Sequence, residues 1–188
     1  MPVTIGSRPP ANSRDPIGWM TECHRRVENF LLVLLKAGEL QGRLLSKEER
    51  DALETALEYF REAAPKHTED EERSLFPRLR NLEFPGRATV LALIDELERD
   101  HSVAQSWHQE MDELGRRWLA AGSLPAVEAA RFQDLARELD RLYQSHIEIE
   151  EKRIFPAAAG RLPSDELKVI GEEMAARRGL RSTFDEHT

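Results

Sequence analysis

Apolar residues that recur three and four positions apart constrain the fold of this chain more than any other feature. This spacing places apolar side chains on one face of an α-helix, and it recurs in segments at about 15–42, 46–80, 87–121 and 125–158. No segment shows the alternation of a β-strand. Because short connections join long helices, we expect antiparallel neighbours. The predicted fold class is all-α, an up-down-up-down antiparallel four-helix bundle with an extra short C-terminal helix.

Local signals mark where the predicted helices begin and bend. Asp15 can cap the first helix, and Pro16 suits its first turn. Ser46 with Glu49 three residues later forms the pattern of a capping box. Pro65 interrupts the second apolar pattern, and it predicts a kink or a break into two segments.

The chain divides into three expected parts. Residues 1–14 show no apolar period and are predicted to form a flexible N-terminal arm. Residues 15–160 form the expected bundle, and residues 161–188 supply the C-terminal helix and a tail. That helix is expected to start after Ser164 and to end near Gly179. It could cover the open end of the bundle or make a dimer contact, and the sequence leaves the oligomeric state open.

Composition and charge narrow the classes of partner. The formal net charge is −8, with 35 acidic and 27 basic residues, which disfavours a nucleic-acid binder. The longest apolar run, Phe30 to Leu35, is too short to cross a membrane, which needs about 20 residues. A single cysteine, Cys23, excludes an intramolecular disulfide framework. We therefore expect a cytoplasmic protein that binds neither nucleic acid nor membrane.

Polar residues interrupt the apolar faces of all four helices. They are His24, His67, Glu71, His101, His146 and Glu150. Burying one unpaired carboxylate costs several kcal/mol, whereas the whole fold is stable by only about 5–15 kcal/mol. Two inward-facing glutamates therefore need compensation, and a bound metal ion supplies it most directly.

The chain also contains an internal repeat. Residues 67–77 read HTEDEERSLFP and residues 146–156 read HIEIEEKRIFP. A lone histidine, His24 or His101, precedes each of these segments at a similar distance. The first and second pairs of helices are therefore interpreted as two copies of one hairpin.

Helix geometry predicts that the six polar residues share one level. At a rise of about 1.5 Å per residue, an up-down-up-down bundle brings them to the same height within the error of the helix ends. Four imidazoles and two carboxylates without thiolate suit two iron or manganese ions, with zinc as a substitute. The carboxylates could bridge the two ions.

The order H…HxxxE…H…HxxxE, with Leu75-Phe76-Pro77 and Ile154-Phe155-Pro156, resembles the hemerythrin-like (HHE cation-binding) family over roughly residues 15–158. The resemblance implies a four-helix bundle with a non-haem di-iron centre, oxo- or hydroxo-bridged, in which Glu71 and Glu150 bridge Fe²⁺ or Fe³⁺ ions. Family members bind or sense dioxygen, react with nitric oxide or peroxide, or help to repair iron centres.

The sequence departs from the oxygen-carrying hemerythrins at two positions. Gln105 stands where their fifth histidine lies, and Glu150 replaces the aspartate of their HxxxxD pattern. Glu151 has that longer spacing, but on an ideal helix it points away from His146. The chain therefore looks more like the four-His, two-Glu bacterial members, and this favours reaction with small molecules over reversible carriage.

Other residues near the predicted ligands have two interpretations. Glu28 could support a ligand or lie on the helix surface, and Tyr143 could donate to a metal-bound species or simply pack. Gln105 is a further candidate beside the metal ligands. His108 is expected to be a hydrogen-bonded core histidine, and Cys23 a buried thiol.

Three functions are compatible with these features. The first is a di-iron protein that binds, senses or reacts with dioxygen, nitric oxide or peroxide. The second is an iron-handling or iron-centre repair protein that donates its metal. The third is a helical interaction module with a structural ion such as zinc. The sequence leaves open whether the chain is an enzyme.

Overall fold

The computed structural model describes residues 15–180, and all the regular structure in that range is helical. The arm predicted at 1–14 and the end of the predicted tail, 181–188, lie outside the described residues. Along the chain, the helical elements are α1 (Pro16–Glu39), α2 (Lys47–Glu58), η1 (Tyr59–Ala63), α3 (Ala64–Asp70), η2 (Glu71–Leu75), α4 (Phe76–Arg80), α5 (Arg87–Ala121), α6 (Ala126–Ile149), η3 (Glu150–Ile154), α7 (Phe155–Ala159) and α8 (Ser164–Arg177).

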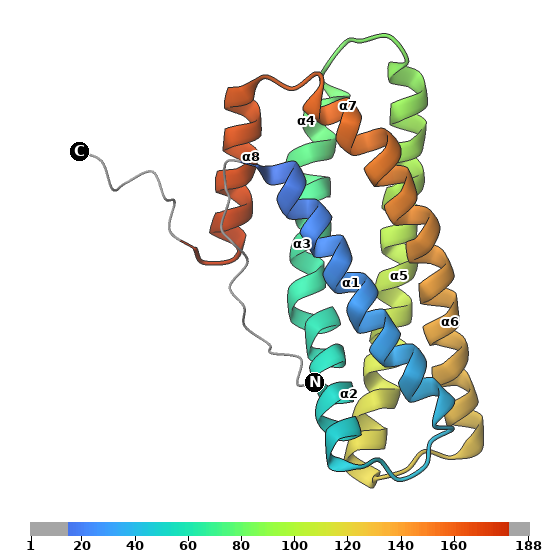
Figure 1. The fold of residues 1–188 in the computed structure, drawn as a ribbon. Helices are drawn as coiled ribbons and strands as arrows, with labels where there is room; N and C mark the ends of the chain where they lie inside the picture. Colours follow the sequence, from blue (N-terminus) through green and yellow to red (C-terminus); the bar gives the residue numbers. More distant parts are fainter. Residues whose placement is uncertain (1–14, 181–188) are drawn as a thin grey trace.

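The helices form a bundle of four rods (Figure 1). α1 and α5 are single helices, whereas α2 to α4 and α6 to α7 each form one continuous rod through η segments. α1 packs against the rods of α2 and α6, and α5 packs against the same two rods. The loop after α1 and the loop after α5 lie at one end, and the loop after α4 lies at the other. Because α1 and α5 both pack against the other two rods, the four rods enclose one interior.

The predicted helix starts are confirmed. The Asp15 side chain accepts a hydrogen bond from the Gly18 amide at 2.8 Å, and Pro16 occupies the first position of α1. Ser46 and Glu49 form a reciprocal capping box, with the Glu49 amide donating to the Ser46 hydroxyl at 3.2 Å. These caps satisfy amide groups that the first helical turn leaves without a partner.

Three prolines explain the three η segments, which are π-helical turns. A proline ring clashes with the carbonyl four residues earlier, and a π turn widens the helix at that point. The kink predicted at Pro65 is confirmed, because η1 ends two residues before it. Pro77 and Pro156 follow η2 and η3 at the same spacing. These two turns begin at Glu71 and Glu150, and they were not predicted from the sequence.

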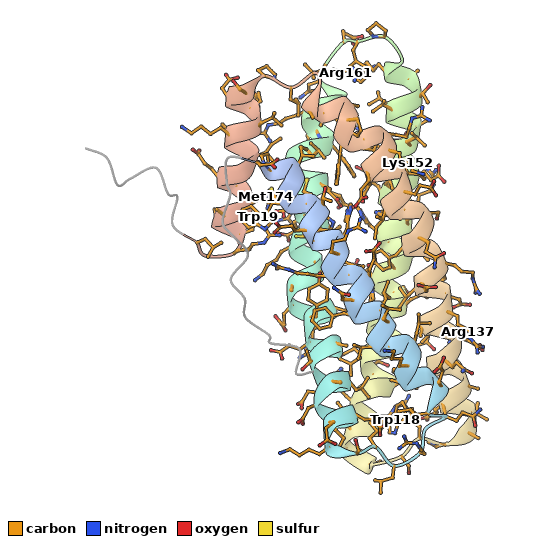
Figure 2. All side chains as sticks on the ribbon, viewed as in Figure 1. Trp19, Trp118, Arg137, Lys152, Arg161 and Met174 are labelled. Carbon is orange, nitrogen blue, oxygen red and sulfur yellow. The ribbon has the colours of Figure 1, made fainter. Side chains whose placement is uncertain are left out.

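Two apolar clusters fill the bundle, and the polar residues separate them along each rod. On α1, Met20 belongs to one cluster and Val27 to the other, with His24 between them. Trp118 marks the cluster near one end, and Trp19 marks the other cluster (Figure 2). Apolar packing on both sides therefore shields the polar layer from water.

The C-terminal helix α8 lies along the side of the bundle, against α1 and α3. Met174 of α8 and Trp19 of α1 belong to the same buried apolar cluster (Figure 2). The fully buried Asp70 carboxylate accepts from Arg177 at 2.8 Å and from Arg178 at 2.6 Å. The helix therefore covers the flank of α3 next to η2 rather than the open end of the bundle, and its role as a dimer contact stays a prediction.

Candidate metal centre

The structure brings all six sequence-predicted ligands together in the interior. One group of donor atoms comes from His24, His67, Glu71 and Glu150. The other comes from Glu71, His101, His146 and Glu150. Within each group, the donor atoms lie within 4.8 Å of one another. The two groups share both carboxylates, as two neighbouring ions with bridging ligands require.

Each carboxylate directs its two oxygen atoms to different groups. Glu71 Oε1 lies 3.3 Å from His67 Nε2, and Glu71 Oε2 lies 3.3 Å from His101 Nε2. Glu150 Oε2 lies 3.0 Å from His24 Nε2, and Glu150 Oε1 lies 3.2 Å from His146 Nε2. Each carboxylate therefore reaches both groups, one oxygen to each.

The carboxylate oxygens test whether a metal pair fits this cluster. Both side chains are fully buried, and none of their four oxygens has a hydrogen-bond partner of acceptable geometry among the described residues. Unpaired buried charges of this kind are strongly destabilising. Two divalent cations would neutralise Glu71 and Glu150 and satisfy their oxygens. The nitrogen and oxygen donors suit iron, manganese or zinc.

Carboxylates from the opposite repeat orient two of the imidazoles. His24 Nδ1 lies 2.9 Å from Glu151 Oε1, and His101 Nδ1 lies 2.8 Å from Glu72 Oε1. An Nδ1–H bond to a carboxylate fixes the ring so that Nε2 points inward. Neither residue was predicted to orient an imidazole, and Glu151 was considered only as a possible ligand. The sequence feature that could have indicated this role is the glutamate directly after each predicted bridging glutamate in the repeat.

The other two imidazoles differ from each other. His146 Nδ1 lies 3.3 Å from Asp100 Oδ2, whereas the buried His67 Nδ1 has no partner among the described side chains and backbone. The repeat explains this difference, because Cys23 precedes His24 where Asp100 precedes His101. Cys23 is buried, as expected, and its thiol provides no carboxylate acceptor for His67 Nδ1.

The electrostatics favour ionised glutamates. Burial alone would raise the pKa of Glu71, but electrostatic interaction with His67 and the proximity of the His101 and His24 imidazoles hold it well below its usual value. Burial opposes protonation of His24, yet the neighbouring Glu150 and Glu71 carboxylates raise its pKa to about 10. Protons and metal ions therefore compete for the same nitrogens, so acid weakens metal binding.

The remaining predicted residues lie outside the cluster. The Glu28 carboxylate is on the surface, where it accepts from Arg25 at 2.8 Å, so its surface interpretation is confirmed. The Tyr143 hydroxyl lies 3.1 Å from His108 Nε2, which makes His108 the hydrogen-bonded core histidine that we expected. Gln105 is exposed and lines a cavity between α3 and α5.

A helical bundle with paired histidine and glutamate clusters in its interior defines a class of metal-binding proteins. The family model described as the hemerythrin HHE cation binding domain matches residues 15–158. A protein of Haemophilus influenzae, named only as uncharacterized, is 30% identical over 177 residues, which cover 91% of this chain and 94% of that protein. The chain therefore belongs to the hemerythrin HHE cation-binding family. None of the described helices is long and apolar enough to cross a membrane.

Proposed function

We propose that this chain is a non-haem di-iron protein that binds, senses or reacts with dioxygen, nitric oxide or peroxide in the cytoplasm. We also propose that successive rods of the bundle run in opposite directions, in up-down-up-down order. The observation that carries the di-iron proposal is the pair of buried carboxylates, Glu71 and Glu150, each of which offers one oxygen to each histidine pair. Bound iron would supply reversible electron transfer and coordination of a small ligand.

The residues of the chain have separate tasks in this function. His24 and His67 would hold one ion, and His101 and His146 the other. Four donors for each ion leave coordination positions for a small molecule. The carboxylates behind the imidazoles keep the ring nitrogens in place. The apolar clusters on both sides exclude water from the centre.

Metal analysis of freshly purified protein tests the proposal. Protein from iron-supplied cells should contain about two iron ions per chain, with an absorption spectrum that changes on addition of dithionite. His67→Ala and Glu150→Ala should lose the metal, and Glu28→Ala, on the surface, should keep it. Iron-free, colourless wild-type protein would contradict the proposal.

The same samples separate the two other functions. Zinc at full occupancy, without a redox response, would identify a structural ion in an interaction module. Rapid release of iron to a chelator on reduction, with transfer to a damaged iron centre, would identify an iron-handling or repair protein. A reaction that consumes dioxygen, nitric oxide or peroxide without loss of iron would support the first proposal.

A further inference from the structure

A cavity of about 540 Å³ lies between α5 and the segment from η1 to α3. It penetrates the bundle, because its lining includes Leu34 of α1 and Tyr143 of α6 as well as residues of the two outer walls. The predicted ligand His101 also contributes to it. Cavities that hold small organic molecules measure about 300–1,000 Å³, whereas one water needs only about 10–15 Å³. The cavity therefore exceeds what a diatomic gas requires.

The inner lining combines apolar surface with one polar pair. Leu57, Phe60 and Met111 supply apolar surface. His108 stacks on Phe60 with ring centroids 4.2 Å apart, and its Nε2 atom is paired with the Tyr143 hydroxyl. The Nδ1 atom of His108 is buried and has no hydrogen-bond partner among the described residues. A buried polar atom without a partner is destabilising, and a ligand that bonds to it would relieve this cost.

The hydrogen-bonding capacity of this pair points to a hydroxyl group. If Tyr143 donates to His108 Nε2, then His108 Nδ1 carries a hydrogen and needs an acceptor. If Nε2 carries the hydrogen instead, Nδ1 is an acceptor and the Tyr143 hydroxyl hydrogen is free. A ligand hydroxyl both donates and accepts, so it suits either tautomer. A carbonyl group, which only accepts, or a protonated amine, which only donates, would suit one of them.

The charges around the cavity disfavour an anionic ligand. Its two lining arginines, Arg61 and Arg116, both pair with Asp112 at 2.9 Å. Burial lowers the pKa of His108 to about 3, so the imidazole is neutral at pH 7. The lining glutamates Glu69 and Glu72 add negative charge. An uncharged ligand therefore avoids both repulsion and the loss of hydration that a charge suffers.

We propose that this cavity is a binding site for a small uncharged organic molecule with an apolar body and one hydroxyl group. The hydroxyl bonds to His108, and the apolar body lies against Phe60, Leu57 and Met111. The bound molecule is then next to His101. The groups that contact the molecule, His108 and the apolar side chains, lie outside the metal cluster, so binding does not require the metal.

Binding of phenol to the purified full-length chain tests this site, with toluene and benzoate as comparison ligands. Phenol has the hydroxyl group, toluene has a methyl group in its place, and benzoate is charged at pH 7. By titration calorimetry we expect saturable binding of phenol near or below about 1 mM. Toluene should bind about tenfold more weakly, because it forms no hydrogen bond with either tautomer of His108. Benzoate should show no binding.

Two variants and one control locate the binding. His108→Phe keeps a ring against Phe60 and should remove the preference for phenol over toluene. Ala104→Phe fills the cavity from α5 and should abolish binding of both. Val127→Phe, on the exposed surface of α6, should bind as the wild type does. Circular dichroism checks that each variant is folded, and if Ala104→Phe does not fold, His108→Phe alone decides.

Three results would overturn the site. The first is wild-type protein that fails to bind phenol at about 10-fold above the expected concentration. The second is equal affinity for phenol and toluene, and the third is an unchanged preference for phenol in His108→Phe. Iron content is measured on the same samples. Phenol binding by wild-type protein that was purified without iron would support the cavity site and contradict the di-iron proposal. Wild-type protein that contains iron but does not bind phenol would support the di-iron proposal and contradict the cavity site.

Discussion

At the scale of single residues, the partners of the imidazole Nδ1 atoms should decide how tightly metal is held. Glu72 bonds to His101 Nδ1 at 2.8 Å, whereas Glu69, one turn earlier and equally exposed, pairs with Arg73. Glu72→Gln should lower metal affinity by about 10–100-fold, because the ring loses its charged acceptor. Competition with a chromogenic chelator measures this affinity.

Glu69→Gln is the matched control for this prediction. It changes the same side chain on the same rod without touching an imidazole. Its metal affinity should equal that of the wild type. If both variants bind metal equally well, the carboxylates behind the imidazoles do not contribute to metal binding.

His108 predicts a pH dependence of stability. Its folded-state pKa is about 3 because of burial, against about 6.5 in the unfolded chain. Between these values the unfolded chain binds a proton that the folded chain does not, so stability falls as the pH decreases below about 6.5. From pH 7 to pH 5, the wild type should lose about 2 kcal/mol more than His108→Phe.

Urea unfolding of both proteins at the two pH values measures this difference. The other histidines titrate in both proteins, so their contributions cancel in the comparison. Parallel losses of stability in the wild type and in His108→Phe would show that His108 accepts a proton in the folded protein.

At the scale of elements, one buried carboxylate attaches α8 to the bundle. Asp70 is fully buried and pairs with Arg177 and Arg178, so its removal deprives both arginines of their nearest carboxylate. Asp70→Ala should lower the free energy of unfolding by about 3–5 kcal/mol. Chemical denaturation measures the loss, and hydrogen exchange of α8 amides shows whether that helix detaches.

The exposed pair of Asp95 and Arg80 provides the comparison for α8. Because solvent screens an exposed ion pair, Asp95→Ala should cost less than about 1 kcal/mol. An Asp70→Ala protein as stable as Asp95→Ala, with α8 still protected from exchange, would show that the apolar cluster shared by Met174 and Trp19 holds α8 without the ion pairs.

At the scale of the whole molecule, metal should control thermal stability, since the polar layer separates two apolar clusters. Metal at about 100 times its Kd stabilises the folded state by about 2.7 kcal/mol. For a chain of this size, that corresponds to a rise in Tm of about 5–10 °C. Differential scanning calorimetry with metal and with a chelator measures the shift.

Glu150→Ala and Glu28→Ala give opposite expectations in the same calorimetric experiment. The first removes a carboxylate that reaches both histidine pairs, so its Tm should not respond to metal. The second lies on the surface and should retain the wild-type shift. An unchanged metal response in Glu150→Ala would place the stabilising metal elsewhere in the protein.

Local rules in the sequence determined the helices and the level of the polar layer. Caps such as Asp15 and Ser46 depend on residues three positions away, and apolar spacing depends on the fixed rise and turn of an α-helix. The repeat of His67 and Glu71 at His146 and Glu150 placed both pairs at the same level in the two hairpins. Glu150 rather than Glu151 lies in the cluster, as the helical spacing predicted.

Only the tertiary structure decided which residues meet across the bundle. The pairing of Glu151 with His24, the π turns before Pro77 and Pro156, and the position of α8 were not predicted. Apolar spacing tells which face of a helix is buried. It does not fix the rotation of each rod to the ångström that a hydrogen bond between distant segments requires. Packing of all the rods together sets that rotation, and with it the carboxylates behind each imidazole.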